Sequence, residues 1–178
     1  DLITTTGTDG YGVYLSTAES NTLTLTSALT STGTNGDTVR LDSSNTNNIT
    51  LTGNISTSGQ YAQGFSLSDS DSNTINYTGN ISTSGQSGVG LYLIRSDSNT
   101  ATLTGDITTT ESSAHGLYLV ASDSNTLTMT GGISATGSSA YAIYVDSEAD
   151  NNTINLTLNR GDRLVGGIYN DGSGNTLN

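Results

Sequence analysis

Asparagine returns every 26 residues through most of this chain, and the residues around it return with it. Five apolar positions repeat at the same spacing, and one such column is Leu15, Leu41, Leu67, Leu93, Leu119 and Val145. A unit this short cannot close a core by itself, so each unit must bury its apolar positions by stacking on its neighbours. The period therefore predicts a solenoid.

The pattern within one repeat predicts β-strands. The segment Asn99-Thr-Ala-Thr-Leu-Thr-Gly105 alternates between apolar and polar residues, which is typical of a strand with one buried face. Two further short apolar segments occur in each repeat, and no helical spacing appears. We therefore expect an all-β parallel β-helix (β-solenoid) of about 26 residues per coil, with three short strands per coil.

The length of 178 residues corresponds to somewhat under seven such coils, in one domain spanning residues 1–178. The repeat loses its regularity from about residue 146. The sequence starts and stops within repeats, so we expect a fragment of a longer stack. Its open strand edges predict end-to-end self-association.

The net charge and the composition limit the classes of partner that are expected. The formal charge is −12, and four arginines are the only Lys or Arg residues, which argues against nucleic acid as a ligand. No apolar run is long enough for a transmembrane helix, so direct membrane insertion is not expected. Cysteine is absent, which leaves no disulfide framework.

The recurring asparagines are expected to be structural. In a parallel stack, equivalent residues of successive coils lie about 4.7–4.9 Å apart, so their side-chain amides can form a ladder inside a turn. The residues of this ladder are Asn21, Asn47, Asn73, Asn99 and Asn125.

The repeat combines a Gly-Leu-Tyr-Leu strand, a Ser-Asp-Ser-Asn-Thr turn, a Thr-Leu-Thr-Gly strand and an Asn-Ile-Ser-Thr-Ser-Gly segment. In this it resembles the passenger domains of bacterial autotransporters, and the less regular stretch 152–177 is similar to passenger coils nearer the membrane barrel. The resemblance implies a right-handed parallel β-helix on the bacterial cell surface. It also implies a non-enzymatic stalk or adhesin that contacts host or neighbouring-cell surface molecules in adhesion, aggregation or biofilm.

An alternative function comes from the outward positions of the Thr-rich strand. Successive coils place threonine in three columns without an intervening charge, an array that resembles the Thr-x-Thr surfaces of ice-binding β-solenoids. High β propensity and favourable pairing of threonine are the structural explanation of the same pattern. The threonines of this array are Thr22, Thr24, Thr26, Thr50, Thr52, Thr74, Thr78, Thr100, Thr102, Thr104, Thr126, Thr128, Thr130, Thr153 and Thr157.

Two more columns are candidates for binding. An outward aromatic column is a stacking strip for sugars, a partner surface, or simply packing between coils; it comprises Tyr14, Arg40, Ser66, Tyr92, Tyr118 and Tyr144. A turn column stacks like charges that calcium would relieve, although no known calcium-loop spacing is present; it comprises Glu19, Asn45, Asp71, Asp97, Asp123 and Asp150.

No motif predicts catalysis. The single histidine, His115, is expected to be an exposed turn residue, and without cysteine few pairs of nucleophile and base remain. Carboxylates one coil apart carry little information, because stacking produces such spacings automatically. The tripeptide Arg160-Gly161-Asp162, which integrins read in matrix proteins, is interpreted as an ordinary turn.

Overall fold

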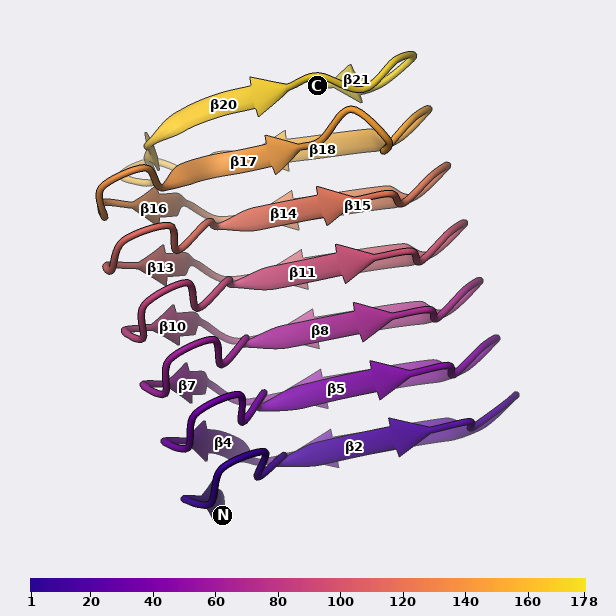
Figure 1. Ribbon diagram of the computed structural model, residues 1–178, viewed down its shortest axis with the longest axis vertical. Coiled ribbons are helices and arrows are strands. Elements are labelled where there is room, and N and C mark those ends of the chain that lie inside the picture. Colours follow the sequence, from indigo (N-terminus) through magenta and orange to yellow (C-terminus); the bar gives the residue numbers. More distant parts are fainter.

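The chain forms a right-handed parallel β-helix whose coils rise from the N-terminal to the C-terminal end of the molecule (Figure 1). A computed structural model describes all residues, 1–178, and contains no helix. Each coil contributes one strand to each of three parallel sheets of seven strands. The predicted fold class, with three short strands per coil, is confirmed.

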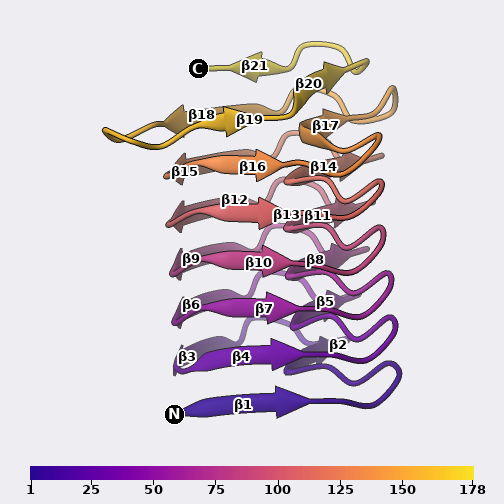
Figure 2. The same ribbon diagram turned by 90° about the vertical axis from the view of Figure 1, so that its left-hand side faces the viewer.

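Sheet A runs along one side of the stack (Figure 2), and its strands have two to four residues. It contains β1 (Leu2–Thr5), β4 (Ala28–Ser31), β7 (Ile55–Thr57), β10 (Ile81–Thr83), β13 (Ile107–Thr109), β16 (Ile133–Ala135) and β19 (Leu164–Val165).

Sheet B follows sheet A after a long loop in each coil (Figure 2). It contains β2 (Val13–Ser16), β5 (Val39–Asp42), β8 (Phe65–Ser68), β11 (Leu91–Ile94), β14 (Leu117–Val120), β17 (Tyr141–Val145) and β20 (Gly167–Asn170).

Sheet C carries the Thr-rich strands and completes the coil. It contains β3 (Thr22–Thr26), β6 (Asn48–Thr52), β9 (Thr74–Thr78), β12 (Thr100–Thr104), β15 (Thr126–Thr130), β18 (Thr153–Thr157) and β21 (Thr176–Leu177).

Equivalent residues lie directly over one another, as the period predicts. Leu103 of β12 pairs with Tyr77 of β9 on one side and with Met129 of β15 on the other. The inward side chains of all three sheets form one continuous core of 26 buried residues. Burial stabilises each large apolar side chain by roughly 1.5–3 kcal/mol, and because the coils share the core, each coil depends on its neighbours.

Glycine permits the sharp bend between sheets C and A. Gly79 and Gly105 adopt φ angles of 148° and 134°, which L-residues with a side chain rarely adopt. The bend lets Ile81 and Ile107, two residues further on, point back into the core.

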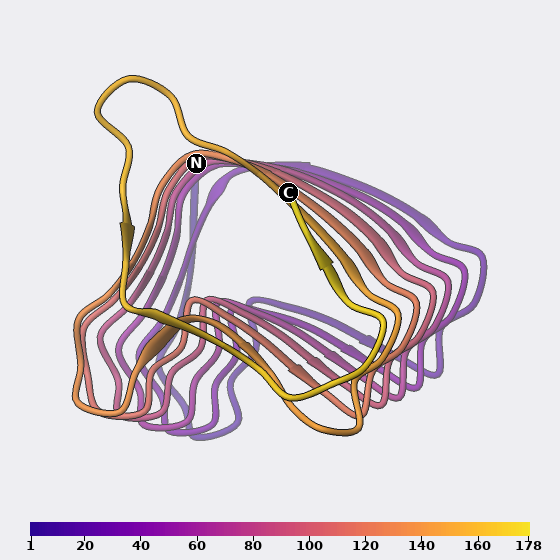
Figure 3. The ribbon, with the colours of Figure 1, turned by 90° about the horizontal axis from the view of Figure 1, so that it is seen from above.

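The last coils are irregular. Sheet B has a register shift between Tyr141 and Ile143, where β17 pairs with β20. Between β18 and β19 the chain leaves the common outline of the coils in a protruding loop (Figure 3). No helix of the length and hydrophobicity needed to cross a lipid bilayer is present.

Candidate functional site

The asparagine column forms a buried hydrogen-bonded ladder. Asn99 Nδ2 donates to Asn125 Oδ1 at 3.2 Å and to the Ser70 carbonyl at 2.9 Å, while the Asn99 backbone amide donates to the same Asn125 oxygen at 2.8 Å. The same bonds recur along the column, and Asn152 and Asn175 extend it. Every buried side-chain amide of the column bonds to protein, so the column supports the fold.

The side chains of the acidic turn column form hydrogen bonds with backbone amides. The carboxylates of Asp71, Asp97 and Asp123 each accept the backbone amide of the equivalent residue in the next coil at 2.7 Å. These bonds give the stacked carboxylates a structural role, because an ionised oxygen that accepts an amide hydrogen bond is stabilised by it. No group of three or more His, Cys, Asp or Glu side chains is placed to hold a metal ion.

The threonine array forms the outer face of sheet C. Thr100, Thr102 and Thr104 pair in register with Thr126, Thr128 and Thr130, and the same register continues through the stack. Thr128 accepts a hydrogen bond from Asn155, and no other hydroxyl of the array bonds to a protein group. The face therefore offers aligned rows of methyl and hydroxyl groups to water.

The aromatic column lies on the outer face of sheet B. Its rings lie close together from one coil to the next: the centroids are 5.2 Å apart for Tyr92 and Tyr118, 4.8 Å for Tyr118 and Tyr144, and 4.6 Å for Tyr144 and Tyr169. Tyr169 extends the column beyond the residues expected from the sequence. Only Ser66 and Arg40 interrupt it between Tyr14 and Tyr169.

The prediction that His115 is exposed is wrong. Only 7% of its surface is accessible, because it packs between the rings of Tyr118, Tyr141 and Tyr144. Its Nδ1 accepts the Tyr141 backbone amide at 3.0 Å. Burial lowers the pKa of the imidazole, so His115 acts as a neutral packing residue and a ladder acceptor.

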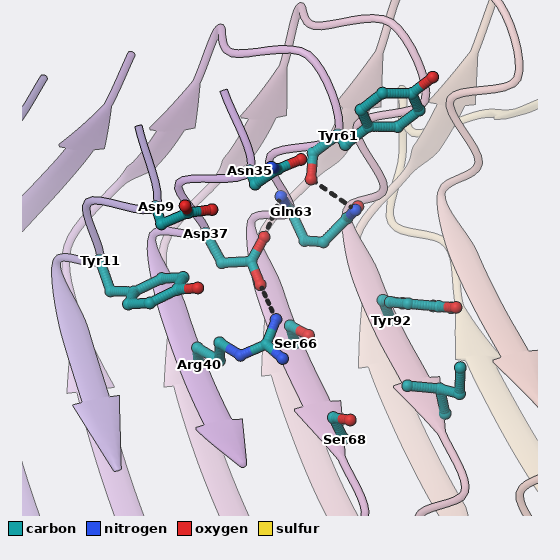
Figure 4. Close-up of a pocket in the computed structure, with 11 residues that line it drawn as sticks. Asp9, Tyr11, Asn35, Asp37, Arg40, Tyr61, Gln63, Ser66, Ser68 and Tyr92 are labelled. Carbon is teal, nitrogen blue, oxygen red and sulfur yellow. Dashed lines mark hydrogen bonds and ion pairs between the residues drawn. The ribbon is translucent and has the colours of Figure 1, made fainter. Parts of the chain in front are cut away.

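A hollow of about 410 Å³ lies where the aromatic column is interrupted (Figure 4). We call it the Ser66 hollow. It is bounded by sheet B on one side and by the loops between sheets A and B on the other, where the outline of the molecule is indented (Figure 3). Its lining includes Asp37, Arg40, Tyr61, Gln63, Ser66 and Tyr92.

An ion pair between the buried Asp37 and the partly exposed Arg40 forms one wall of the hollow. Asp37 Oδ2 accepts from Arg40 Nη1 at 3.1 Å, and Asp37 Oδ1 accepts the Gln63 backbone amide at 2.7 Å. Arg40 Nη2 also lies 3.8 Å from Asp42 Oδ2, and the guanidinium lies 5.6 Å from the centre of the Tyr11 ring. The position of the arginine is thus fixed from three sides.

Burial raises the pKa of Asp37 to about 6, against the opposing effects of the Gln63 amide and Arg40. The folded protein therefore holds this proton more tightly than the unfolded chain does. The resulting stabilisation is complete below about pH 4 and is lost as the pH rises through about 6.

We expect the wild-type protein to lose on the order of 2–3 kcal/mol of unfolding free energy between pH 4 and pH 7.5, relative to the Asp37→Asn variant. Urea unfolding of both proteins across this range measures the difference. Parallel stability curves for the two proteins would contradict the raised pKa.

The Arg160-Gly161-Asp162 tripeptide lies in the protruding loop between β18 and β19. Asp162 Oδ2 accepts the Asn159 backbone amide at 2.7 Å, which closes a local turn. The tripeptide lies several coils away from the Ser66 hollow, which is formed around β5, β8 and β11.

The chain matches no protein-family model, no curated protein and no solved structure. The candidate sites therefore rest on the geometry of this molecule alone.

Proposed function

We propose that this chain is a rigid, non-enzymatic display element of an extracellular bacterial surface protein. It acts as a stalk or adhesin toward host or neighbouring-cell surface molecules. The observation that carries the proposal is the continuous parallel pairing of all three seven-stranded sheets along the stack. Parallel coils that share one core and a buried amide ladder form a stiff rod, which holds a binding surface away from its attachment point.

The hydrogen bonds made by the carboxylates and the imidazole favour a function that involves no catalysis. The stacked carboxylates hold backbone amides, and the one imidazole is buried with its Nδ1 occupied. Active sites hold a free nucleophile or base in a cleft, whereas the carboxylate of the Ser66 hollow, Asp37, is held by Arg40 and the Gln63 backbone amide.

Display on a non-adherent bacterium tests this function. The chain is fused to an unrelated outer-membrane anchor, and aggregation and attachment to cultured epithelial cells are compared with the anchor alone. We expect several-fold more aggregation or attachment for the folded chain. Equal values for the chain and for the anchor alone would reject the display role.

Ice binding by the threonine array is the second candidate, and the free hydroxyls of three aligned rows favour it. Neighbouring threonines lie about 4.7–4.9 Å apart between coils and roughly 6.6–6.8 Å apart along a strand. Such a lattice orders water without the strong local hydration of a charged group.

For this candidate we expect the wild-type chain to inhibit ice recrystallisation and Thr102→Lys to lose at least ten-fold in activity, because a lysine in the middle row disrupts the water over its neighbours. Ser82→Lys, on the outer face of sheet A, serves as the matched control and should keep full activity. An inactive wild-type chain would dismiss ice binding.

A further inference from the structure

The Ser66 hollow is the place of a missing aromatic ring. Tyr92, Tyr118, Tyr144 and Tyr169 each place one ring on the outer face of sheet B in consecutive coils. Ser66 occupies the equivalent position in the coil before Tyr92, and Tyr92 pairs directly with it. The small serine does not fill the space that a side-chain ring fills in the later coils. Ser66 is itself buried, and the hollow opens between its neighbours Arg40, Gln63 and Tyr92.

The hollow continues along the solenoid axis. A second hollow of about 290 Å³ lies between the loops and the next two coils, and it shares Tyr61, Gln63 and Tyr92 with the first. Together we call these two hollows the tyrosine groove. Both are close to the size range of small-ligand pockets, and because they adjoin at these three residues, a ligand that occupied both would extend along the axis.

Tyr92 stands at the centre of this groove. In Figure 4 its ring is seen edge-on, with Gln63 and Tyr61 on one side of the ring plane, so one face of the ring is turned toward that wall of the groove. An aromatic face of this kind packs well against the C–H bonds on the flat side of a sugar ring, because the face of the ring is electron-rich.

The polar groups of the groove match hydroxyl groups. The Asp37 carboxylate accepts, Arg40 donates, and the side chains of Gln63, Ser66 and Ser68 can each do both. Most of these groups already have partners in the protein, since Gln63 Nε2 donates to the Tyr61 carbonyl and Ser68 donates to Asp69, so a ligand hydroxyl would bond to their remaining lone pairs and N–H groups. The hydroxyls around the rim of a sugar ring offer both donors and acceptors.

The charge of the groove favours a neutral ligand. Arg40 is paired with Asp37 and lies near Asp42, so an anionic ligand would have to compete with two carboxylates for the one guanidinium. A peptide is also disfavoured, because every strand of sheet B within the groove is already paired on both sides and offers no edge for another backbone.

We propose that the tyrosine groove binds a neutral glycan chain along the solenoid axis, with one pyranose ring in the Ser66 hollow and Tyr92 as the stacking platform. This proposal rests on the proposed display role, because the glycan would be met on a neighbouring cell surface. The tyrosine groove would then be the part of the displayed chain that binds the glycan.

The test uses the intact chain on an array of neutral hexose and N-acetylhexosamine oligosaccharides, with acidic oligosaccharides alongside. Calorimetry then measures the affinity for the best neutral binder. We expect Ser66→Tyr, which completes the aromatic column, to weaken binding at least ten-fold while the chain stays folded by circular dichroism. Tyr92→Ala should weaken it comparably, whereas Thr52→Tyr on the outer face of sheet C should not.

Neutral binding that Ser66→Tyr abolishes and Thr52→Tyr retains would support the proposal. Three results would overturn it: no neutral oligosaccharide bound at millimolar concentration, binding of acidic oligosaccharides only, or equal affinity of Ser66→Tyr and the wild-type chain. If the displayed chain still promotes aggregation or attachment in any of these cases, the display role stands and only the glycan site is rejected.

Discussion

Replacing Asn99 with alanine is expected to lower the free energy of unfolding by about 3–5 kcal/mol. Asn99 Oδ1 accepts both the backbone amide of Asn73, at 2.8 Å, and the Asn73 side-chain amide, at 3.1 Å. Its Nδ2 donates to the Ser70 carbonyl. Alanine removes all of these bonds, and each buried polar group left without a partner costs about 1–3 kcal/mol.

The matched control is Asn21→Ala, which makes the same substitution in the first coil of the same column. Asn21 is exposed, so water replaces the lost partners and we expect a loss below about 1 kcal/mol. Urea unfolding followed by far-ultraviolet circular dichroism compares the two variants. Equal losses of unfolding free energy at both positions would show that burial does not determine how much each asparagine of the ladder contributes to stability.

The register of the coils was predictable because stacking gives every residue of a column the same environment. Leu25, Leu51, Tyr77, Leu103 and Met129 are all apolar for one reason, since each faces the same strip of core. The strict alternation of the Thr-rich strands sets which face is buried. Period and alternation together thus predicted the fold class and the columns.

The end of the ladder was missed because the spacing changes there. Asn152 lies 27 residues after Asn125, the same spacing at which the neighbouring columns continue to Asp150 and Thr153, so it could have been predicted, whereas Asn175 lies only 23 residues further on. Their signal in the sequence was local: each is followed by Thr and an apolar residue, Thr153-Ile154 and Thr176-Leu177, as Asn125 is by Thr126-Leu127.

The burial of His115 and the Ser66 hollow were not predictable from the period. Both depend on how far the loops between sheets A and B reach over the outer face of sheet B, and a column of turn residues gives no information on that reach. Tyr61, for example, has a φ of 58°, a left-handed conformation that it shares with Asp9 and Asn35 of the same column, and this turn does not indicate how far the loop reaches. The sequence shows that a serine interrupts the aromatic column, but it does not show that the loops between sheets A and B form the opposite wall of a hollow there.

The second large effect is expected at the bend between sheets C and A. We expect Gly105→Val to destabilise the protein by about 3 kcal/mol or more, because two costs add. A side chain at the observed φ of 134° is strained, and its Cβ would overlap the Gly79 carbonyl of the preceding coil. The substitution must therefore displace backbone that takes part in the stacking, where Gly105 donates to the Thr130 carbonyl at 2.9 Å.

Gly7→Ala separates these costs from the general effect of replacing glycine. A Cβ at Gly7 would meet no atom within 4 Å, and this residue does not have a positive φ. Alanine there should leave stability unchanged or raise it by up to about 1 kcal/mol, since it restricts the unfolded chain. Urea midpoints of the two variants, measured with the wild type, give the comparison. A Gly105→Val protein as stable as Gly7→Ala would mean that the coils do not approach each other at this bend as the structure has them, because neither the strain nor the overlap would then exist.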